Sequence, residues 1–213
     1  MHVVSRPRAL VVLGHGAGRG TDTADLLGLA RDLPRDGVHV VLVDQPWVVA
    51  GRRIAAAPHT LDVAWVTVLD GLRSRLGLRP RLPLVVGGRS AGARVACRTA
   101  VTTRADAVLL LACPLVPPAA RADADKHAAA LAKRRPELLA PVEAGIPVVV
   151  AQGERDAFGT AAELRELVRR RRLVEIVEVP DADHSLRTRA AGPDPAPVLR
   201  AAAMRAVARA RGE

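Results

Sequence analysis

The sequence is poor in aromatic residues and in cysteine. Its 213 residues include no tyrosine, one phenylalanine, two tryptophans and two cysteines. The chain therefore lacks the aromatic platforms on which proteins stack unpaired bases. With only Cys97 and Cys113 it has no disulfide framework, and residues 1–8 lack the apolar core of a signal peptide. Both observations favour a cytoplasmic location.

Lysine is also scarce, so arginine supplies nearly all of the basic charge. Lys126 and Lys133 are the only lysines, yet the formal net charge is +10. The arginines are spread along the whole chain, with the densest group at residues 169–172. This pattern is typical of a solvated basic surface, and we expect no specific nucleic-acid partner.

Long apolar runs and metal-ligand patterns are missing as well. No apolar run approaches the roughly 20 residues that span a bilayer, so we expect no membrane partner. No spacing of Cys, His, Asp and Glu resembles a metal site, and we expect neither a metal nor another cofactor. The length and a hydrophobic content of 49% fit a single domain over residues 1–213.

Short apolar runs alternate with helical patterns along the chain. We predict buried strands at residues 9–13, 38–43, 84–88, 107–112, 147–151 and 173–179. We predict helices at about 21–33, 60–76, 91–103, 163–171 and 197–209, a short helical piece at 125–133, and a turn near Pro141. The alternation predicts an α/β protein whose parallel sheet has helices on both faces.

The third predicted strand ends in the segment Gly87-Gly88-Arg89-Ser90-Ala91-Gly92 and passes directly into alanine-rich helical sequence. Gly-x-Ser-x-Gly between a strand and a helix is the pattern of a nucleophile elbow, which holds a serine hydroxyl clear of the sheet. The helix aims its first amides at negative charge that develops beside the serine. We therefore predict that Ser90 is a nucleophile.

Two later strand ends carry an acid and a histidine. Asp156 follows the fifth strand and His184 follows the sixth, and the order serine, acid, histidine is that of α/β-hydrolases. His184 would take the proton of Ser90, and Asp156 would fix the tautomer of His184. Three other acids in the same loops compete with Asp156 for this role: Glu154, Asp181 and Asp183.

A glycine-rich loop at residues 14–20 follows the first strand. An oxyanion in the transition state needs two backbone amides, and we expect them from Ala91 and from the Gly16–Ala17 segment. His15 would hold this loop by hydrogen bonds or line the substrate pocket. The other candidate pocket residues are Trp47 and Phe158, which would wall an acyl site, and Arg89, which would favour an anionic substrate.

The same loop, with Asp44 ending the second strand, also resembles a dinucleotide site. The spacing Gly-x-Gly-x-x-Gly is absent, however. Short-chain dehydrogenases, which this loop would resemble, also use a catalytic tyrosine, and this chain has no tyrosine. These two departures count against a nucleotide cofactor.

Several motifs together resemble a small α/β-hydrolase. They lie at residues 13–18, 87–92, 113–118, 152–159 and 183–184. They are similar to a bacterial subfamily of hydrolases, distantly related to dienelactone hydrolases, that also includes relatives of animal testis-expressed protein 30 and of subunit 3 of the non-specific-lethal chromatin complex. The chain departs from this subfamily at Ala91, Ala93 and Val116, where methionine, glycine and histidine are usual.

This resemblance implies an α/β-hydrolase fold, with six parallel strands in the order 2-1-3-4-5-6 and a minimal lid between Pro114 and Gly145. The function that we predict is a serine hydrolase that cleaves a carboxylic ester or related acyl bond through an acyl-enzyme on Ser90. Its partner would be a small-molecule acyl substrate. The alternative is a non-catalytic interaction protein with the same fold, although a scaffold needs none of Ser90, Asp156 and His184.

Overall fold

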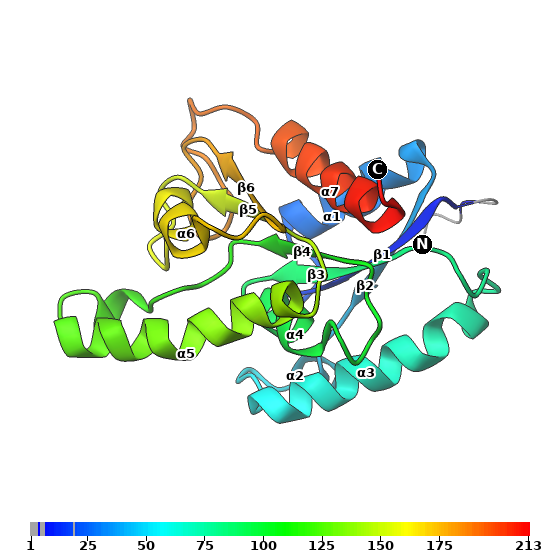
Figure 1. Cartoon of the computed structure of the whole chain (residues 1–213), viewed down its shortest axis with the longest axis horizontal. Helices are drawn as coiled ribbons and strands as arrows, with labels where there is room; N and C mark the ends of the chain where they lie inside the picture. The colour runs from blue at the N-terminus through cyan, green and yellow to red at the C-terminus, as the bar shows by residue number, and fades with distance from the viewer. Residues whose placement is uncertain (1–3, 5–6, 19) are drawn as a thin grey trace.

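A six-stranded sheet forms the centre of the computed structural model, which describes residues 4, 7–18 and 20–213. Its strands are β1 (Ala9–Gly14), β2 (Val38–Val43), β3 (Leu84–Arg89), β4 (Ala107–Leu111), β5 (Val148–Gly153) and β6 (Val174–Val179). Neighbouring strands are all parallel, in the order β2-β1-β3-β4-β5-β6 (Figure 1). The predicted fold class and strand order are confirmed.

The strands are continuous apolar runs because both faces of the sheet are covered. Successive side chains of a strand point to opposite faces. In β1, Leu10 and Val12 therefore enter one hydrophobic core, and Val11 and Leu13 enter the other.

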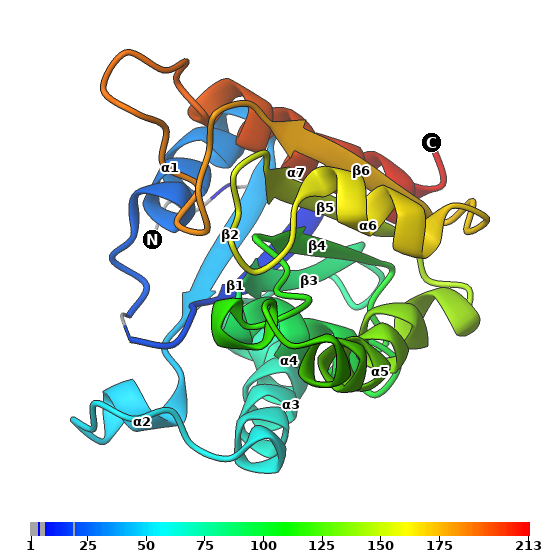
Figure 2. The ribbon, with the colours of Figure 1, turned by 90° about the vertical axis from the view of Figure 1, so that its left-hand side faces the viewer.

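Helices form a layer on each face of the sheet. One layer consists of α1 (Ala24–Asp32) and α7 (Ala196–Arg211), and the other of α3 (Pro58–Arg75), α4 (Ala91–Thr99), α5 (Ala124–Glu143) and α6 (Ala161–Val168). Figure 2 shows α1 and α7 on one side of the sheet and α3, α4 and α5 on the other. Three short helices complete the fold: η1 (Leu33–Asp36), α2 (Pro46–Val49) and η2 (Pro118–Ala120).

The helix α5 is longer than the sequence pattern predicts. Instead of a short piece at 125–133 and a turn near Pro141, one helix runs through Pro136 and Pro141 to Glu143. Each internal proline removes a backbone hydrogen bond. Burial of Leu138 and Leu139 in the core offsets that loss. The segment between Pro114 and Gly145, where the resemblance implied a minimal lid, consists mainly of this helix.

None of the helices in the described part of the chain combines the length and apolar character needed to cross a bilayer.

Candidate active site

The turn from β3 into α4 holds Ser90 in an unusual backbone conformation. Its φ is 51° and its ψ is −104°, a strained combination for a residue with a side chain. The Ser90 amide donates to the Leu111 carbonyl at 3.0 Å, which fixes the turn against β4. A Cβ at Gly88 or Gly92 would lie 2.3 or 2.4 Å from the Gly14 carbonyl oxygen. Only glycine at both positions lets the turn pack this closely against β1.

Ser90, His184 and Asp156 form one hydrogen-bonded row. The Ser90 Oγ lies 3.0 Å from His184 Nε2. The other ring nitrogen, Nδ1, lies 2.9 and 2.8 Å from the two carboxylate oxygens of Asp156. A carboxylate only accepts, so Nδ1 carries the proton and Nε2 is free to accept from the serine hydroxyl. The structure thus brings together three side chains that follow three different strands.

The competing acids have other partners. Asp183 accepts hydrogen bonds from the backbone amides of Ser185 and Arg187, which closes the turn that carries His184. Glu154 accepts from the Asp181 amide, and the Asp181 carboxylate pairs with arginine side chains. These acids shape the loops around the row, and Asp156 is the one that reaches His184.

Gln152 supports Asp156, and the sequence analysis missed it. Its Nε2 donates to Asp156 Oδ2 at 2.9 Å, and its Oε1 accepts from the Cys113 amide at 2.8 Å. The Phe158 amide donates to Asp156 Oδ1 at 2.8 Å. Gln152 is fully buried and Asp156 is 2% exposed, so these donors replace water around the carboxylate. The available signal was an amide side chain at the second-to-last position of a buried apolar strand.

Arg89 joins the turn that holds Ser90 to the loop after β6 that carries His184, here called the histidine loop. Its Nη2 donates to the His184 carbonyl at 3.2 Å and to Ser185 Oγ at 3.1 Å. Its Nε lies 3.5 Å from Asp25 Oδ2, an ion pair that the sequence analysis did not anticipate. On the other side of the histidine, the Phe158 ring packs against the imidazole with ring centroids 4.2 Å apart.

His15 orients the loop that follows β1. Its Nε2 accepts from the Gln45 amide at 2.8 Å, so Nδ1 carries the proton and donates to the Gly16 carbonyl at 2.8 Å. Because the peptide is planar and trans, the Ala17 N–H points away from that bonded carbonyl. A Cβ on Gly16 would lie 3.3 Å from the Ser90 Cβ, so the loop borders the serine.

A second free amide lies on the other side of Ser90. Ala91 is the first residue of α4, and the first amides of a helix have no partner within it. The next amide, that of Gly92, is already used because it donates to the His15 carbonyl at 3.1 Å. Among the described residues, neither the Ala91 amide nor the Ala17 amide donates to another backbone carbonyl.

Two residues expected along the pocket, His15 and Trp47, are buried. His15 is fully buried, Trp47 is 2% exposed, and their rings meet edge to face with centroids 5.0 Å apart. Arg89 does line a cavity of about 300 Å³, together with Ala17, Gly18 and Ser185. That cavity borders the histidine loop and the candidate oxyanion loop, and its lining includes neither His15 nor Trp47.

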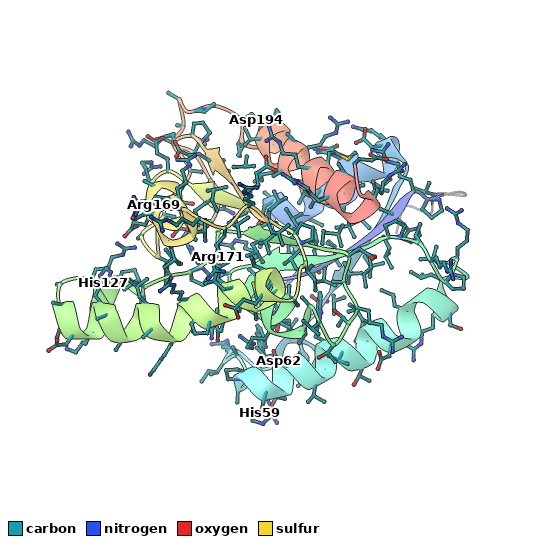
Figure 3. The ribbon with its side chains drawn as sticks, in the orientation of Figure 1. His59, Asp62, His127, Arg169, Arg171 and Asp194 are labelled. Atoms are coloured by element: carbon teal, nitrogen blue, oxygen red, sulfur yellow. The ribbon has the colours of Figure 1, made fainter. Side chains whose placement is uncertain are left out.

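Three further histidines of the described residues lie on elements outside the proposed catalytic row. His59 and His127 lie on α3 and α5 (Figure 3), and His39 is buried in β2. Among residues 4, 7–18 and 20–213, no group of three or more His, Cys, Asp or Glu side chains is arranged to hold a metal ion.

Comparison with known proteins identifies the family. A family model described as an alpha/beta hydrolase domain matches residues 7–210. The chain therefore belongs to the α/β-hydrolase domain family. A search of curated proteins found no match.

Solved structures share the fold at low sequence identity. Est1E from Butyrivibrio proteoclasticus, solved with ferulic acid, has a TM-score of 0.71 and 12% identity, covering 95% of this chain and 91% of its own. XC6422 from Xanthomonas campestris, described as a serine hydrolase without a lid, has a TM-score of 0.67 and 20% identity over 95% of this chain and 84% of its own. An α/β serine hydrolase homologue from Coxiella burnetii has a TM-score of 0.62 and 16% identity, with 84% and 80% covered.

Proposed function

We propose that this hydrolase cleaves a carboxylic ester or related acyl bond of a small molecule, through an acyl-enzyme on Ser90. The observation that carries the proposal is the row from Ser90 Oγ to His184 Nε2 and from His184 Nδ1 to Asp156. A scaffold protein has no need of a strained serine aligned with a histidine and a buried carboxylate. That alignment favours catalysis over the alternative of a non-catalytic interaction protein.

The first half of the reaction follows from the positions of these atoms. Ser90 Oγ attacks the acyl carbon as its proton passes to His184 Nε2. The amides of Ala17 and Ala91 stabilise the oxyanion, and Asp156 stabilises the imidazolium. His184 then gives the proton to the departing oxygen, the bond between that oxygen and the acyl carbon breaks, and the acyl group remains on Ser90.

The second half repeats these steps with water. His184 takes a proton from a water molecule whose oxygen attacks the acyl carbon. The bond to Ser90 Oγ then breaks, and the serine recovers its proton from His184. The net change is one water consumed for each ester cleaved, and no cofactor takes part.

We also propose that the chain belongs with the bacterial relatives of testis-expressed protein 30 and of subunit 3 of the non-specific-lethal complex. The support is the set of five motifs in the same order, from residues 13–18 to 183–184. XC6422, a neighbour described as lacking a lid, supports an active site without a large covering domain.

Fluorophosphonate labelling tests the proposed activity. The serine oxygen would displace fluoride from phosphorus, so we expect the wild-type protein to be labelled and Ser90→Ala and His184→Ala to remain unlabelled. Ser74→Ala is the matched control, because Ser74 is exposed on α3. A wild-type protein that is folded but unlabelled, or a Ser90→Ala protein that labels as well as the control, would show that Ser90 is not the nucleophile.

A further inference from the structure

A groove lies beside the proposed active site, on the surface between α1 and α7. It consists of two cavities, of about 300 and 320 Å³. Both are lined by Ala24, Asp25, Ser185 and Arg187, so they lie side by side. The first cavity also borders Arg89, next to Ser90 in the chain, and Ala17 of the candidate oxyanion loop.

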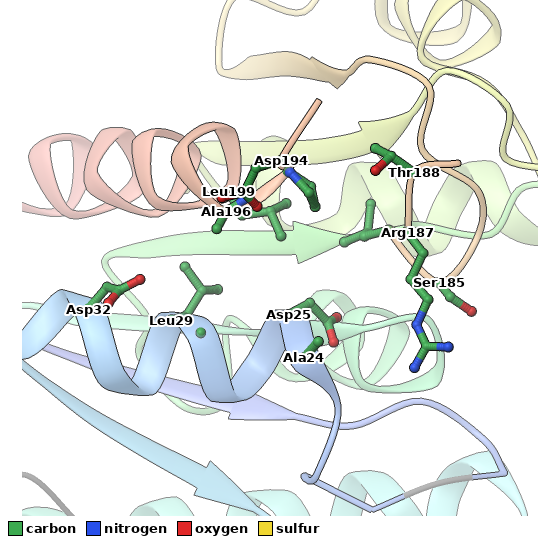
Figure 4. Close-up of a pocket in the computed structure, with 13 residues that line it drawn as sticks. Ala24, Asp25, Leu29, Asp32, Ser185, Arg187, Thr188, Asp194, Ala196 and Leu199 are labelled. Carbon is green, nitrogen blue, oxygen red and sulfur yellow. The ribbon is translucent and has the colours of Figure 1, made fainter. Parts of the chain in front are cut away.

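The groove changes in character along its length. Near Ser90 its walls are polar, with Arg89, Ser185 and Arg187. Farther out it is mainly apolar, lined by Leu29 of α1, Leu199 of α7 and Leu186 of the histidine loop. Figure 4 shows α1 and the start of α7 on opposite sides of this outer part, with Ser185 and Arg187 at one end.

The histidine loop is built to shape this groove. Ser185 to Thr188, the residues that directly follow His184, form its wall. Leu186 has a φ of 54° and is only 2% exposed, a strained conformation that a packed environment has to maintain. Asp183 holds the same turn through the amides of Ser185 and Arg187, at 2.7 and 3.1 Å.

The position of this wall decides which part of an ester lies in the groove. In the proposed mechanism, His184 gives its proton to the oxygen of the departing alcohol, so the alcohol part lies on the histidine side of Ser90. We propose that the groove binds the alcohol part of the substrate as an unbranched apolar chain. The preferred substrates would then be esters of aliphatic alcohols. This inference rests on the proposed hydrolase function.

The charges around the groove favour an uncharged chain. Asp194, beside Leu199 and Ala196, would repel a chain that ends in a carboxylate, whereas Asp32 is paired with Arg31 and Arg35 (Figure 4). Asp25 is paired with Arg89 at the inner end, so that carboxylate offers no free charge to a cationic group. Binding of an alkyl chain is instead favourable, because the chain leaves water for the leucine-lined part of the groove.

Gly28 offers a way to fill the groove without disturbing the fold. It lines the outer part, and a Cβ added to it would meet nothing within 4 Å. Gly28→Leu therefore places a side chain in open space. Gly71→Leu is the matched control, a glycine in helix α3 in the layer on the other face of the sheet. There a new Cβ would meet only the flexible end of Arg75.

The first experiment measures kcat/KM for methyl, butyl and hexyl acetate. Burial of each additional methylene is worth up to about fourfold in kcat/KM, so we expect the wild-type values to rise along the series. Gly28→Leu should reduce the ratio of hexyl to methyl acetate by about tenfold or more. Gly71→Leu should keep the wild-type ratio.

A parallel series of p-nitrophenyl acetate, butyrate and hexanoate varies the acyl chain and identifies which end of the ester the groove binds. We expect Gly28→Leu to leave the ratios in this series unchanged. The proposal fails if the wild-type alcohol series is flat. It also fails if Gly28→Leu alters only the acyl series, because the acyl chain would then occupy the groove.

A binding measurement separates this proposal from the proposed activity. If no ester is hydrolysed and no fluorophosphonate label is taken up, the activity on Ser90 is wrong. Binding of hexyl acetate to the Ser90→Ala protein, followed by NMR shifts of the Leu29, Leu186 and Leu199 methyl groups, then tests the groove alone. Shifts that disappear in Ser90→Ala/Gly28→Leu support the groove as an alkyl site, and the absence of shifts in Ser90→Ala overturns it.

Discussion

Gln152 shows how a single buried side chain can position the proposed catalytic residues. Its amide donates to Asp156 at 2.9 Å and to the Gly159 carbonyl at 2.5 Å. We expect Gln152→Ala to lower kcat about 10- to 100-fold with little change in KM, because a hydrogen bond to a charged group is worth about 1.5–3 kcal/mol. Steady-state kinetics on p-nitrophenyl acetate, with circular dichroism to confirm folding, measures this effect. An unchanged kcat in a folded variant would show that Asp156 does not need Gln152.

His39 provides a second prediction at the scale of one residue. It is 2% exposed, and neither ring nitrogen has a hydrogen-bond partner among the described residues. Burial lowers the pKa of His39 below its ordinary value, because the charged imidazolium loses its hydration. At pH values between the folded and the unfolded pKa, His39 therefore stays neutral in the folded protein but binds a proton in the unfolded chain. The stability that neutral His39 contributes is fully present above the unfolded pKa of about 6.5. It is lost as the pH falls from there towards the folded pKa.

We accordingly expect His39→Leu to remove part of the acid sensitivity of the fold. The wild-type free energy of unfolding should fall by up to about 1.4 kcal/mol per pH unit from this one proton, and the variant should lack that contribution. Urea unfolding of both proteins at several values between pH 7 and pH 5 measures the difference. Parallel pH dependence in the two proteins would contradict the assignment to His39.

At the scale of elements, Glu137 connects α5 to α4. Its carboxylate accepts from Arg94 at 2.9 and 3.0 Å, and it lies 3.4 Å from guanidinium nitrogens of Arg98 and Arg134. Burial alone would raise the pKa of Glu137, but the hydrogen bond from Arg94 and the three positive charges outweigh it and lower that pKa. Stability from this group is present above the ordinary glutamate pKa of 4.5 and is lost as the pH falls through the lowered folded value.

We expect Glu137→Gln to destabilise the protein, because Arg94 and Arg134 then lose their counter-charge and only Arg98 keeps one, in Asp62. The expected loss is about 2 kcal/mol, less than the roughly 3–5 kcal/mol of a fully buried pair, since the side chain is 20% exposed. Glu166→Gln is the matched control: this glutamate is 71% exposed and pairs with Arg169 at 3.6 Å, and we expect its loss to stay below about 0.5 kcal/mol. Equal effects of the two substitutions in denaturant unfolding would contradict the buried network.

The elements differ in how well the sequence predicts them. The six strands and their order are predictable because buried parallel strands are short apolar runs, and a chain of alternating strands and helices has few topologies available. The full length of α5 is not predictable from the sequence, because Pro136 and Pro141 ordinarily indicate the end of a helix. The helix continues because Leu138 and Leu139 pack into the core, and local sequence does not show that contact.

The candidate site, like the elements, is only partly predictable from the sequence. Ser90, Asp156 and His184 carry local signals, since each follows a predicted strand and the chemistry requires their residue types. The pairing of Arg89 with Asp25 joins residues 64 positions apart in the chain and depends on how α1 packs beside the elbow. The role of Gln152 likewise depends on where the loop after β5 folds back, because its contact with Asp156 is a tertiary contact.

At the scale of the whole molecule, the net charge of +10 is distributed in a way that argues against a specific nucleic-acid site. Several arginines pair with carboxylates on other elements: Arg98 with Asp62, Arg121 with Glu163, Arg165 with Glu178, and Arg200 with Asp36. Of the densest basic group, Arg169 and Arg171 lie at the end of α6 (Figure 3). Arg8, Arg79, Arg81 and Arg211 gather around one cavity, but the chain has no tyrosine to stack against bases.

Positive charge without base-stacking side chains binds nucleic acid mainly through released counterions, so the affinity should depend steeply on salt. We expect an electrophoretic shift with mixed-sequence DNA at about 50 mM salt that is lost by about 200 mM. Two duplexes of equal length and unrelated sequence should compete equally. A shift that persists at the higher salt, or one duplex that competes better than the other, would identify a specific nucleic-acid site and contradict the expectation from charge distribution.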